Sequence, residues 1–273
     1  MMAKDFSPPP RINFIVNLFP NSSVKDAIHK SFYFFVNSIL PQKCFKCGVS
    51  LIDLESRSIC NSCLNQISLI KPPFCGSCGL PFQFNYHLPQ GDFYFCEVCR
   101  NSAYYFDKAR SLGKYEGVLK EAMINYKYKG NLKLLNDFMK FFFQAHKNNH
   151  CFNSKKIDLI LYVPLHKKKL VKRNFDQAYL LAKSISILLE RPIKIDLLFK
   201  KKETLPQAGL KKQMRINNVR GAFGIRKKNA LDGKRVLLVD DVFTTGATLN
   251  ECSKVLRKNG AQRIEVFTLA RAI

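Results

Sequence analysis

The segment Arg235–Leu249 constrains the fold more than any other part of the chain, because it combines a strand, a polar loop and the start of a helix. Four consecutive apolar residues after Arg235 predict a short strand that is buried on both faces, as is typical of a parallel sheet. Two carboxylates, Asp240 and Asp241, end this strand. A loop rich in hydroxyl groups follows, and the next residues predict a helix that ends at Gly260.

The polar residues of this segment suit a phosphate and a ribose. The first turn of the helix would present free N–H groups and the positive end of the helix dipole to a phosphate. Gly246 would allow the backbone to approach the ligand closely. Asp240 and Asp241 are acceptors for the vicinal hydroxyl groups of a ribose. Three hydroxyl side chains can donate hydrogen bonds to phosphate oxygens: Thr244, Thr245 and Thr248.

The segment closely resembles the signature of type I phosphoribosyltransferases, which bind 5-phosphoribosyl-1-pyrophosphate (PRPP). The segment contains neither a G-x-x-x-x-G-K-[ST] nor a G-x-G-x-x-G phosphate loop. The resemblance implies an α/β domain with a mostly parallel sheet flanked by helices. The alternative is a Rossmann-like strand end with incidental acidic residues.

Eight cysteines form four C-x-x-C pairs between residues 41 and 100. Two such pairs supply the four thiolates of a tetrahedral zinc site, and four thiolates leave no open position for catalysis. The pattern therefore predicts two structural zinc sites, with disulfides and iron–sulfur ligation as alternatives. Pairing in sequence order gives one site from Cys44, Cys47, Cys60 and Cys63, and another from Cys75, Cys78, Cys96 and Cys99. Interleaved pairing is also compatible with the spacing.

The chain of 273 residues carries a formal net charge of +25, and residues 155–273 hold 27 Lys and Arg against 10 Asp and Glu. A basic surface of this size favours polyanions such as nucleic acid, phosphorylated substrates or anionic membranes. A solvated surface rich in lysine is the alternative. No apolar run is long enough to span a membrane and no signal peptide is visible, so we expect a cytoplasmic protein without a membrane span.

The pattern divides the chain into a leader with an amphipathic helix (1–40), a double zinc-ribbon region (41–100) and a phosphoribosyltransferase-like domain (101–273). Strands are expected at residues 109–115, 157–165, 193–199, 221–225 and 263–270, the last of which would close the sheet. Helices are expected at residues 23–40, 117–127, 132–147 and 174–190. Residues 157–199 would form a right-handed βαβ crossover. Residues 200–220 suit either a lid over the site or a solvated linker.

Two basic segments are candidates for anion binding. The residues from His166 to Arg173 follow a strand and predict a basic loop that could meet a pyrophosphate. The residues from Tyr126 to Lys129 alternate aromatic and charged side chains, which suits single-stranded nucleic acid, although ordinary surface amphipathicity is the alternative. The candidate nucleic-acid residues are Tyr126, Lys127, Tyr128, Lys129, Lys168, Lys169 and Lys172.

Together these features resemble the ComF family, which is associated with natural competence and joins a zinc-ribbon region to a type I phosphoribosyltransferase fold. The resemblance covers about residues 41–273. Besides the cysteine pairs, it rests on 127–130, 163–165, 173–178, Thr204 with Gln207, Arg215 with Asn218, 221–223 and 239–246. One departure is Asp176, where the family usually has asparagine in R-G-F-N-Q-A.

The resemblance implies that Asp240 and Asp241, the candidate catalytic residues, hold the ribose hydroxyls directly or through a hydrated Mg²⁺. Residues from Thr244 to Thr248 would hold the 5-phosphate, and Leu165 to Lys167 would form the pyrophosphate loop. The full implied PRPP set is Asp240, Asp241, Val242, Phe243, Thr244, Thr245, Gly246, Ala247, Thr248, Leu165, His166, Lys167 and Arg173.

Three functions are compatible with these patterns. The first is a protein that binds PRPP and single-stranded DNA during DNA uptake, with other competence or DNA-processing proteins as possible partners. The second is an active phosphoribosyltransferase of the nucleotide-salvage type, which transfers ribose 5-phosphate to a nucleobase or another acceptor. The third is a PRPP-responsive adaptor that binds a partner protein through its zinc ribbons.

Overall fold

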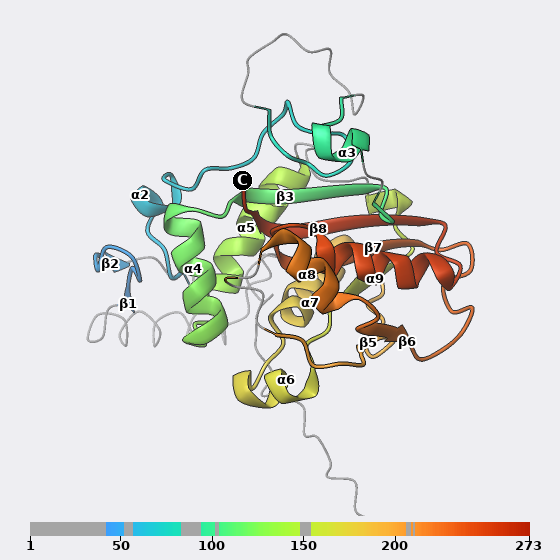
Figure 1. The fold of residues 1–273 in the computed structure, drawn as a ribbon. Helices are drawn as coiled ribbons and strands as arrows, with labels where there is room; N and C mark the ends of the chain where they lie inside the picture. The colour runs from blue at the N-terminus through green and yellow to red at the C-terminus, as the bar shows by residue number, and fades with distance from the viewer. Residues whose placement is uncertain are drawn as a thin grey trace, which may run out of the picture.

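The computed structural model describes residues 42–51, 57–82, 94–101, 104–147, 154–205, 209 and 211–273. The predicted leader and amphipathic helix (1–40) lie outside these residues. Figure 1 shows the described part as one sheet flanked by helices, with the cysteine-rich segments at the left and at the top of the view. In this part of the chain no helix is long and apolar enough to cross a membrane.

The central sheet has four strands in the order β3–β8–β7–β4, and all three pairings are parallel. The strands are β3 (Lys108–Lys114), β4 (Leu159–Tyr162), β7 (Arg235–Phe243) and β8 (Arg263–Arg271). The predicted buried parallel strand at the start of the acidic segment is thereby confirmed. The prediction that the last strand closes the sheet was wrong. β8 lies inside the sheet, where its residues from Ile264 to Arg271 are buried between β3 and β7.

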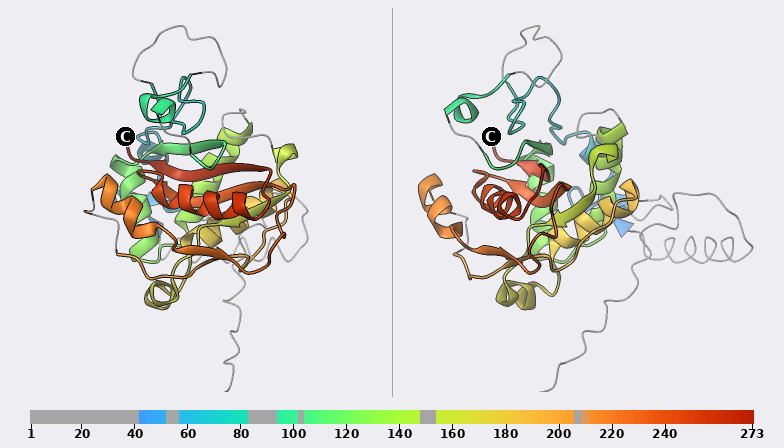
Figure 2. Two further views of the ribbon diagram at one scale, coloured as in Figure 1. Left: turned by 45° about the vertical axis from the view of Figure 1, so that its right-hand side comes forward. Right: turned by 90° about the vertical axis from the view of Figure 1, so that its right-hand side faces the viewer.

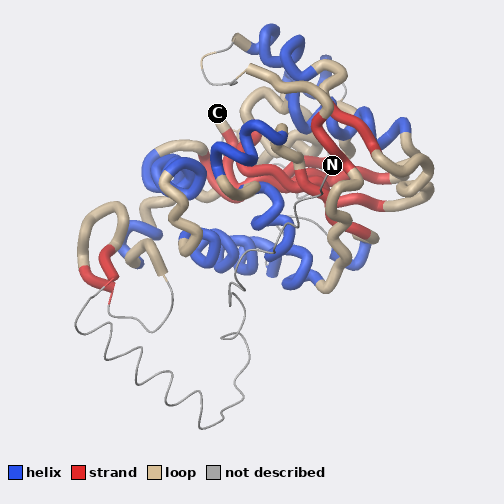
Figure 3. Tube along the Cα trace, turned by 90° about the horizontal axis from the view of Figure 1, so that it is seen from below, coloured by secondary structure: helices blue, strands red, loops and turns tan. Residues whose placement is uncertain are grey.

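Helices cover both faces of this sheet, as the turned views in Figure 2 and the view from below in Figure 3 show. One core contains Leu237 and Val239 of β7 together with buried residues of α4 (Gly117–Tyr128), α5 (Leu134–Lys147) and α7 (Gln177–Leu189). The other core contains Val236 and Leu238 of β7 and buried residues of α9 (Ala247–Lys258). Alternate residues of β7 therefore point to opposite faces, as the geometry of a strand requires.

The cysteine-rich segments pack directly against this α/β unit. Their elements are β1 (Gln42–Lys43), β2 (Ser50–Leu51), α2 (Asn61–Leu64) and α3 (Glu97–Asn101), with β1 and β2 antiparallel. The backbone N–H of Ala109 in β3 donates to the carbonyl of Ser77 at 2.7 Å, and Leu69 forms an antiparallel bridge with Gly113. On the other side, the carboxylate of Asp137 in α5 accepts the N–H of Ser58 at 2.9 Å.

Two predicted elements differ in the structure. The expected basic loop after Pro164 is instead a helix, α6 (Lys167–Arg173), because this stretch contains no glycine or proline and lysine favours helix. The expected βαβ crossover is reduced to one parallel bridge between Ile160 and Ile193. The following strand, β5 (Leu198–Lys200), pairs instead with β6 (Phe223–Ile225) in a separate antiparallel sheet. A short helix, α8 (Lys212–Val219), and a 3₁₀ turn, η1 (Ser154–Lys156), complete the described elements.

Candidate functional site

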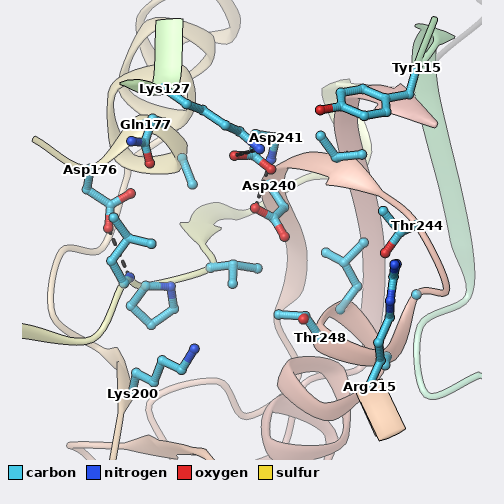
Figure 4. Close-up of a pocket in the computed structure, with 18 of the residues that line it drawn as sticks. Tyr115, Lys127, Asp176, Gln177, Lys200, Arg215, Asp240, Asp241, Thr244 and Thr248 are labelled. Atoms are coloured by element: carbon cyan, nitrogen blue, oxygen red, sulfur yellow. Dashed lines mark hydrogen bonds and ion pairs between the residues drawn. The ribbon is translucent and has the colours of Figure 1, made fainter. Parts of the chain in front are cut away.

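A cavity of about 350 Å³ opens at the edge of the sheet where β4 and β7 end, and we call it the sheet-edge pocket (Figure 4). Parallel strands bring their carboxyl ends to one edge, and this edge is where ligands bind in open α/β sheets. The pocket is lined by Tyr115, Lys127, Tyr128, Val163, Pro164, Leu165, Asp176, Gln177, Ala178, Lys200, Arg215, Asp240, Asp241, Val242, Thr244, Gly246, Ala247, Thr248 and Leu249.

The two carboxylates predicted from the sequence lie in the middle of this pocket. Asp240 and Asp241 are partly buried near the end of β7, and the N–H of Asp241 donates to Oδ1 of Asp240 at 2.8 Å. Burial and the neighbouring charge of Asp241 both raise the pKa of Asp240 above its ordinary range. A cation beside the pair would offset the repulsion between the two neighbouring carboxylates.

Lys127 provides such a cation, and the sequence did not indicate this position for it. Its Nζ lies 2.7 Å from Oδ2 of Asp241, and both side chains are largely buried, with 14% and 17% of their surface exposed. Burial alone would lower the pKa of Lys127, but the charge of Asp241 and the hydrogen bond to it raise this pKa above the ordinary value. Figure 4 shows Lys127 reaching down from the end of α4 toward the acidic pair.

The threonine loop, which we define as residues 244–248, lies on one side of the acidic pair. Gly246 is the N-cap of α9 and has a φ of 75°, a conformation that glycine adopts readily. Thr244, Gly246, Ala247 and Thr248 line the pocket, so the first turn of a twelve-residue helix faces it. Between residues 240 and 248, two members of the implied PRPP set do not line the pocket: Phe243, which is 1% exposed behind the loop, and Thr245.

Asp176 lies on the opposite side of the pocket (Figure 4), and Leu165, to which it is hydrogen-bonded, also lines the pocket. Asp176 caps α7 by accepting the N–H of Tyr179 at 3.1 Å, and its other oxygen accepts the N–H of Leu165 at 3.1 Å. Burial raises the pKa of Asp176 to about 6, against the lowering effect of these backbone donors. An asparagine has one side-chain oxygen, so it could not accept both N–H groups in this way.

Two further cations line the pocket and were not identified from the sequence as site residues. Lys200 comes from β5 and donates to Oγ1 of Thr204 at 2.8 Å. Burial lowers the pKa of Lys200. Arg215 comes from α8, and in Figure 4 its side chain lies near Thr244 and Thr248. Arg215 with Asn218 is one of the motifs that carry the family resemblance, but that motif did not indicate a place in the pocket, and no sequence motif marks Lys200.

Three further members of the implied PRPP set do not line the pocket: His166 and Lys167 of the implied pyrophosphate loop, and Arg173. His166 is the N-cap of α6 and Lys167 is its exposed first residue. Arg173 lies beside the pocket instead. It donates to Oε1 of Gln177 at 3.1 Å, and its guanidinium carbon lies 4.9 Å from the ring centroid of Tyr128.

The candidate nucleic-acid residues are also separated by the fold. Tyr126 is fully buried and donates its hydroxyl to the carbonyl of Gln177, so it cannot stack on a base. Lys127 points into the pocket, whereas Tyr128 is 68% exposed and Lys129 is exposed. The physical reason is the helical repeat of α4, which turns successive side chains to different sides.

The candidate lysines of α6 are partly engaged with neighbouring segments. Lys168 pairs with Glu203 at 2.9 Å, and Lys169 donates to the carbonyl of Thr204 at 3.1 Å. The side chain of Lys172 lies outside the described residues.

The eight cysteines form two clusters in which all sulfur atoms lie within 4.8 Å of one another. Cluster 1 contains Cys44, Cys47, Cys60 and Cys63, and cluster 2 contains Cys75, Cys78, Cys96 and Cys99. Pairing in sequence order is therefore the arrangement that the fold adopts. Backbone N–H groups point at sulfur in both clusters, for example Cys60 N to Cys44 Sγ at 3.4 Å and Cys96 N to Cys75 Sγ at 3.3 Å. Four convergent thiolates with backbone donors fit a tetrahedral zinc ion.

Comparisons with known proteins match both parts of the chain. A model described as "Phosphoribosyl transferase domain" matches residues 176–273, and one described as "Double zinc ribbon domain" matches residues 35–100. Competence protein F of Haemophilus influenzae is 31% identical, covering 84% of this chain and 97% of that protein. Competence protein ComFC of Bacillus subtilis is 29% identical over 78% of this chain and 84% of its own length. DNA utilization protein YhgH of Escherichia coli K12 is 25% identical over 86% and 99%.

The cluster geometry predicts that the purified chain holds two zinc ions. We expect the substitutions Cys47→Ser and Cys99→Ser each to remove one of them, because each cluster would lose one of its four ligands. Elemental analysis of zinc per chain measures this directly. The control is Cys252→Ala, since Cys252 is buried in α9 outside both clusters and its loss should leave the zinc content unchanged. A single ion in the wild type would contradict the prediction.

Proposed function

We propose that this chain, which belongs to the ComF family of competence proteins, binds PRPP in the sheet-edge pocket. The observation that carries the proposal is the position of the two carboxylates of Asp240 and Asp241 between two different walls of the pocket. The threonine loop and the first turn of α9 form one wall. Leu165, Asp176 and Lys200 form the other. PRPP is a ribose with a phosphate at one end and a pyrophosphate at the other, which suits this order of groups.

The threonine loop would hold the 5-phosphate. The first turn of α9 directs backbone N–H groups and the positive end of the helix dipole toward the pocket. The hydroxyls of Thr244 and Thr248 and the guanidinium of Arg215 lie on the same side (Figure 4). Hydrogen bonds from charged donors to phosphate are shorter and stronger than those between neutral groups, and Arg215 suits such contacts.

The acidic pair would hold the ribose hydroxyls. Partly buried carboxylates suit Mg²⁺ with its water shell, and a magnesium ion held there would neutralise charge on the pyrophosphate. Lys127 is paired with Oδ2 of Asp241 at 2.7 Å, and this cation would offset part of the negative charge that the acidic pair brings to the ribose hydroxyls or to a metal-bound water.

The opposite wall would meet the pyrophosphate, and there Asp176 works against binding. Its carboxylate occupies the N–H of Leu165 and adds negative charge near the position of the pyrophosphate. Lys200 supplies the opposing cation. The opposing charges of Asp176 and Lys200 would together set the affinity of this wall for the pyrophosphate.

We also propose that the chain binds single-stranded DNA beside the mouth of the pocket. Tyr128 has 68% of its surface exposed and lines the pocket, and Arg173 lies against its ring and donates to its hydroxyl at 3.3 Å. An aromatic ring held by a guanidinium offers a stacking face next to positive charge, which is how proteins bind single strands without sequence preference. The names of the relatives, competence protein and DNA utilization protein, support this proposal.

Replacing Asp240 with asparagine tests PRPP binding. We expect the dissociation constant of Mg²⁺–PRPP to rise about 100-fold in Asp240→Asn, because one charged acceptor in a partly buried site is lost. Isothermal titration calorimetry measures the change. Asp158→Asn serves as the control, since Asp158 pairs with Arg235 and does not line the pocket. Equal affinity of Asp240→Asn and the wild type, or no binding by the wild type, would refute the proposal.

The substitution Asp176→Asn should have the opposite effect. Removing this charge and releasing the N–H of Leu165 should tighten PRPP binding about tenfold, or about 1.4 kcal/mol. The matched control is Asp137→Asn, because Asp137 is also buried, has a pKa raised to about 6 by burial and accepts a backbone N–H, but lies outside the pocket. Weaker binding by Asp176→Asn would show that the carboxylate contributes to the site.

The DNA proposal predicts that Tyr128→Ala weakens binding of an oligothymidine by about tenfold, since one base loses its stacking partner. Fluorescence anisotropy at several salt concentrations measures affinity and the salt slope, which reports phosphate contacts. Tyr105→Ala is the matched control, because Tyr105 is 44% exposed and has the ammonium of Lys254 over its ring, but does not line the pocket. An equal effect of both substitutions, or an affinity independent of salt, would contradict the proposal.

A further inference from the structure

We propose that Arg271 is a positioning residue that connects cluster 2 to the threonine loop, so that the metal-bound cluster holds this loop in its binding conformation. Two measurements test it, hydrogen exchange in the threonine loop and the affinity for PRPP, and only the second rests on the proposed PRPP binding. This role of Arg271 makes cluster 2 part of the support for the sheet-edge pocket. Cluster 1 would have no such effect.

Arg271 is the last residue of β8, and its side chain is bonded to cluster 2. It is 6% exposed, and its Nη1 donates to the carbonyl of Cys78 at 2.7 Å. Its Nη2 lies 3.4 Å from Sγ of the same cysteine. Four thiolates around one Zn²⁺ leave a net negative charge, and a buried guanidinium bonded to a ligand sulfur offsets it. The two contacts fix the plane of the guanidinium.

The same guanidinium also supports the residue from which the threonine loop starts. Its carbon lies 4.1 Å from the ring centroid of Phe243, the last residue of β7 and the neighbour of Thr244 in the chain. Phe243 and Arg271 are partners in the β7–β8 register. In addition, the carbonyl of Arg271 accepts the N–H of Tyr115, a residue that lines the pocket, at 2.7 Å.

The threonine loop packs closely on the ring that Arg271 holds. A Cβ at Gly246 would lie 2.7 Å from Cζ of Phe243 and 3.2 Å from Cε1 of Tyr104. The ring of Tyr104 also meets the ring of Phe243 edge-on, with 6.3 Å between the ring centroids. The hydroxyl of Tyr104 lies 3.5 Å from the carbonyl oxygen of Thr245. The left-handed backbone at Gly246 therefore rests on two rings, and a movement of the Phe243 ring would leave the loop without this support.

A second buried arginine, Arg110, also contacts cluster 2 but not the base of the threonine loop, so it is a matched comparison for Arg271. Arg110 is 3% exposed and donates to the carbonyls of Cys75 at 3.4 Å and Gly76 at 3.1 Å. Its guanidinium carbon lies 4.4 Å from the ring centroid of Phe74, not against Phe243. Arg110 therefore resembles Arg271 in burial and in its contact with cluster 2 but lacks the contact with the base of the threonine loop.

Cluster 1 is attached to a different part of the domain. Its segment contacts α5 through Ser58 and Asp137, and α4 through the ion pair of Lys46 with Glu121 at 2.7 Å. These contacts are made with α4 and α5, whose buried residues belong to the core that contains Leu237 and Val239 of β7. The loss of metal from cluster 1 should therefore affect stability without a selective effect on the threonine loop.

The experiment compares Arg271→Lys with Arg110→Lys in the full-length, zinc-loaded chain. Lysine keeps the charge but cannot make both contacts with Cys78 and also lie flat on Phe243. We expect both variants to keep two zinc ions per chain. In Arg271→Lys alone, the backbone amides of residues 244–249 should exchange with deuterium about tenfold faster, and the dissociation constant of Mg²⁺–PRPP should rise about tenfold.

Exchange in residues 244–249 decides the inference, whatever the result with PRPP. Unchanged exchange in Arg271→Lys with zinc retained, or equal acceleration in Arg110→Lys, would overturn it. A wild type that does not bind PRPP would refute the proposed function while leaving the exchange comparison intact. If Arg271→Lys does not fold, Phe243→Leu takes its place, because it removes the ring and keeps the contacts between Arg271 and Cys78. Wild-type exchange in that variant would equally overturn the inference.

Discussion

The parallel pairing of β7 with β4 on one side and β8 on the other is the constraint on which the site depends. The register aligns Tyr162 of β4 with Val239 of β7, and Phe243 of β7 with Arg271 of β8. The segment after β4 therefore emerges beside Asp240, and the end of β8 lies beside the start of the threonine loop. Neither arrangement needs a special loop, because parallel strands necessarily end at the same edge.

This common edge brings together charges that the rest of the fold must balance. Three carboxylates and three cations line the pocket: Asp176, Asp240 and Asp241 with Lys127, Lys200 and Arg215. The ion pair between Lys127 and Asp241 shows how the balance is kept in the protein alone. The three cations come from elements that surround the acidic pair. The phosphate groups at the two ends of a ligand could therefore pair with these cations. The pocket is thus suited to an anion that also carries hydroxyl groups or a bound metal.

Sequence patterns predicted the parts of the site that are local in the chain. The strand, the acidic pair and the helix after Gly246 follow one another directly, so each residue constrains its neighbours, and the C-x-x-C pairs are local in the same sense. Lys127 and Arg215 reach the pocket only through tertiary packing, and no periodicity marks them. The prediction of a loop in the basic stretch after Pro164 is wrong, because its lysines favour helix and no glycine or proline interrupts residues 165–173.

The same packing argues against treating the zinc ribbons as an appended module. Asp137, whose pKa burial raises to about 6, is buried in the core-forming helix α5 and bonded to the backbone of Ser58. At the other end, Gly79 packs so closely on β3 that a Cβ there would lie 2.6 Å from the carbonyl oxygen of Ala109. If the zinc ribbons unfolded, these contacts would be lost. Buried polar groups would then be unpaired and one edge of the sheet would be uncovered. Metal binding by the cysteines therefore contributes to the stability of the whole described unit, because cysteines of cluster 1 are buried in one core of the α/β unit and cysteines of cluster 2 in the other.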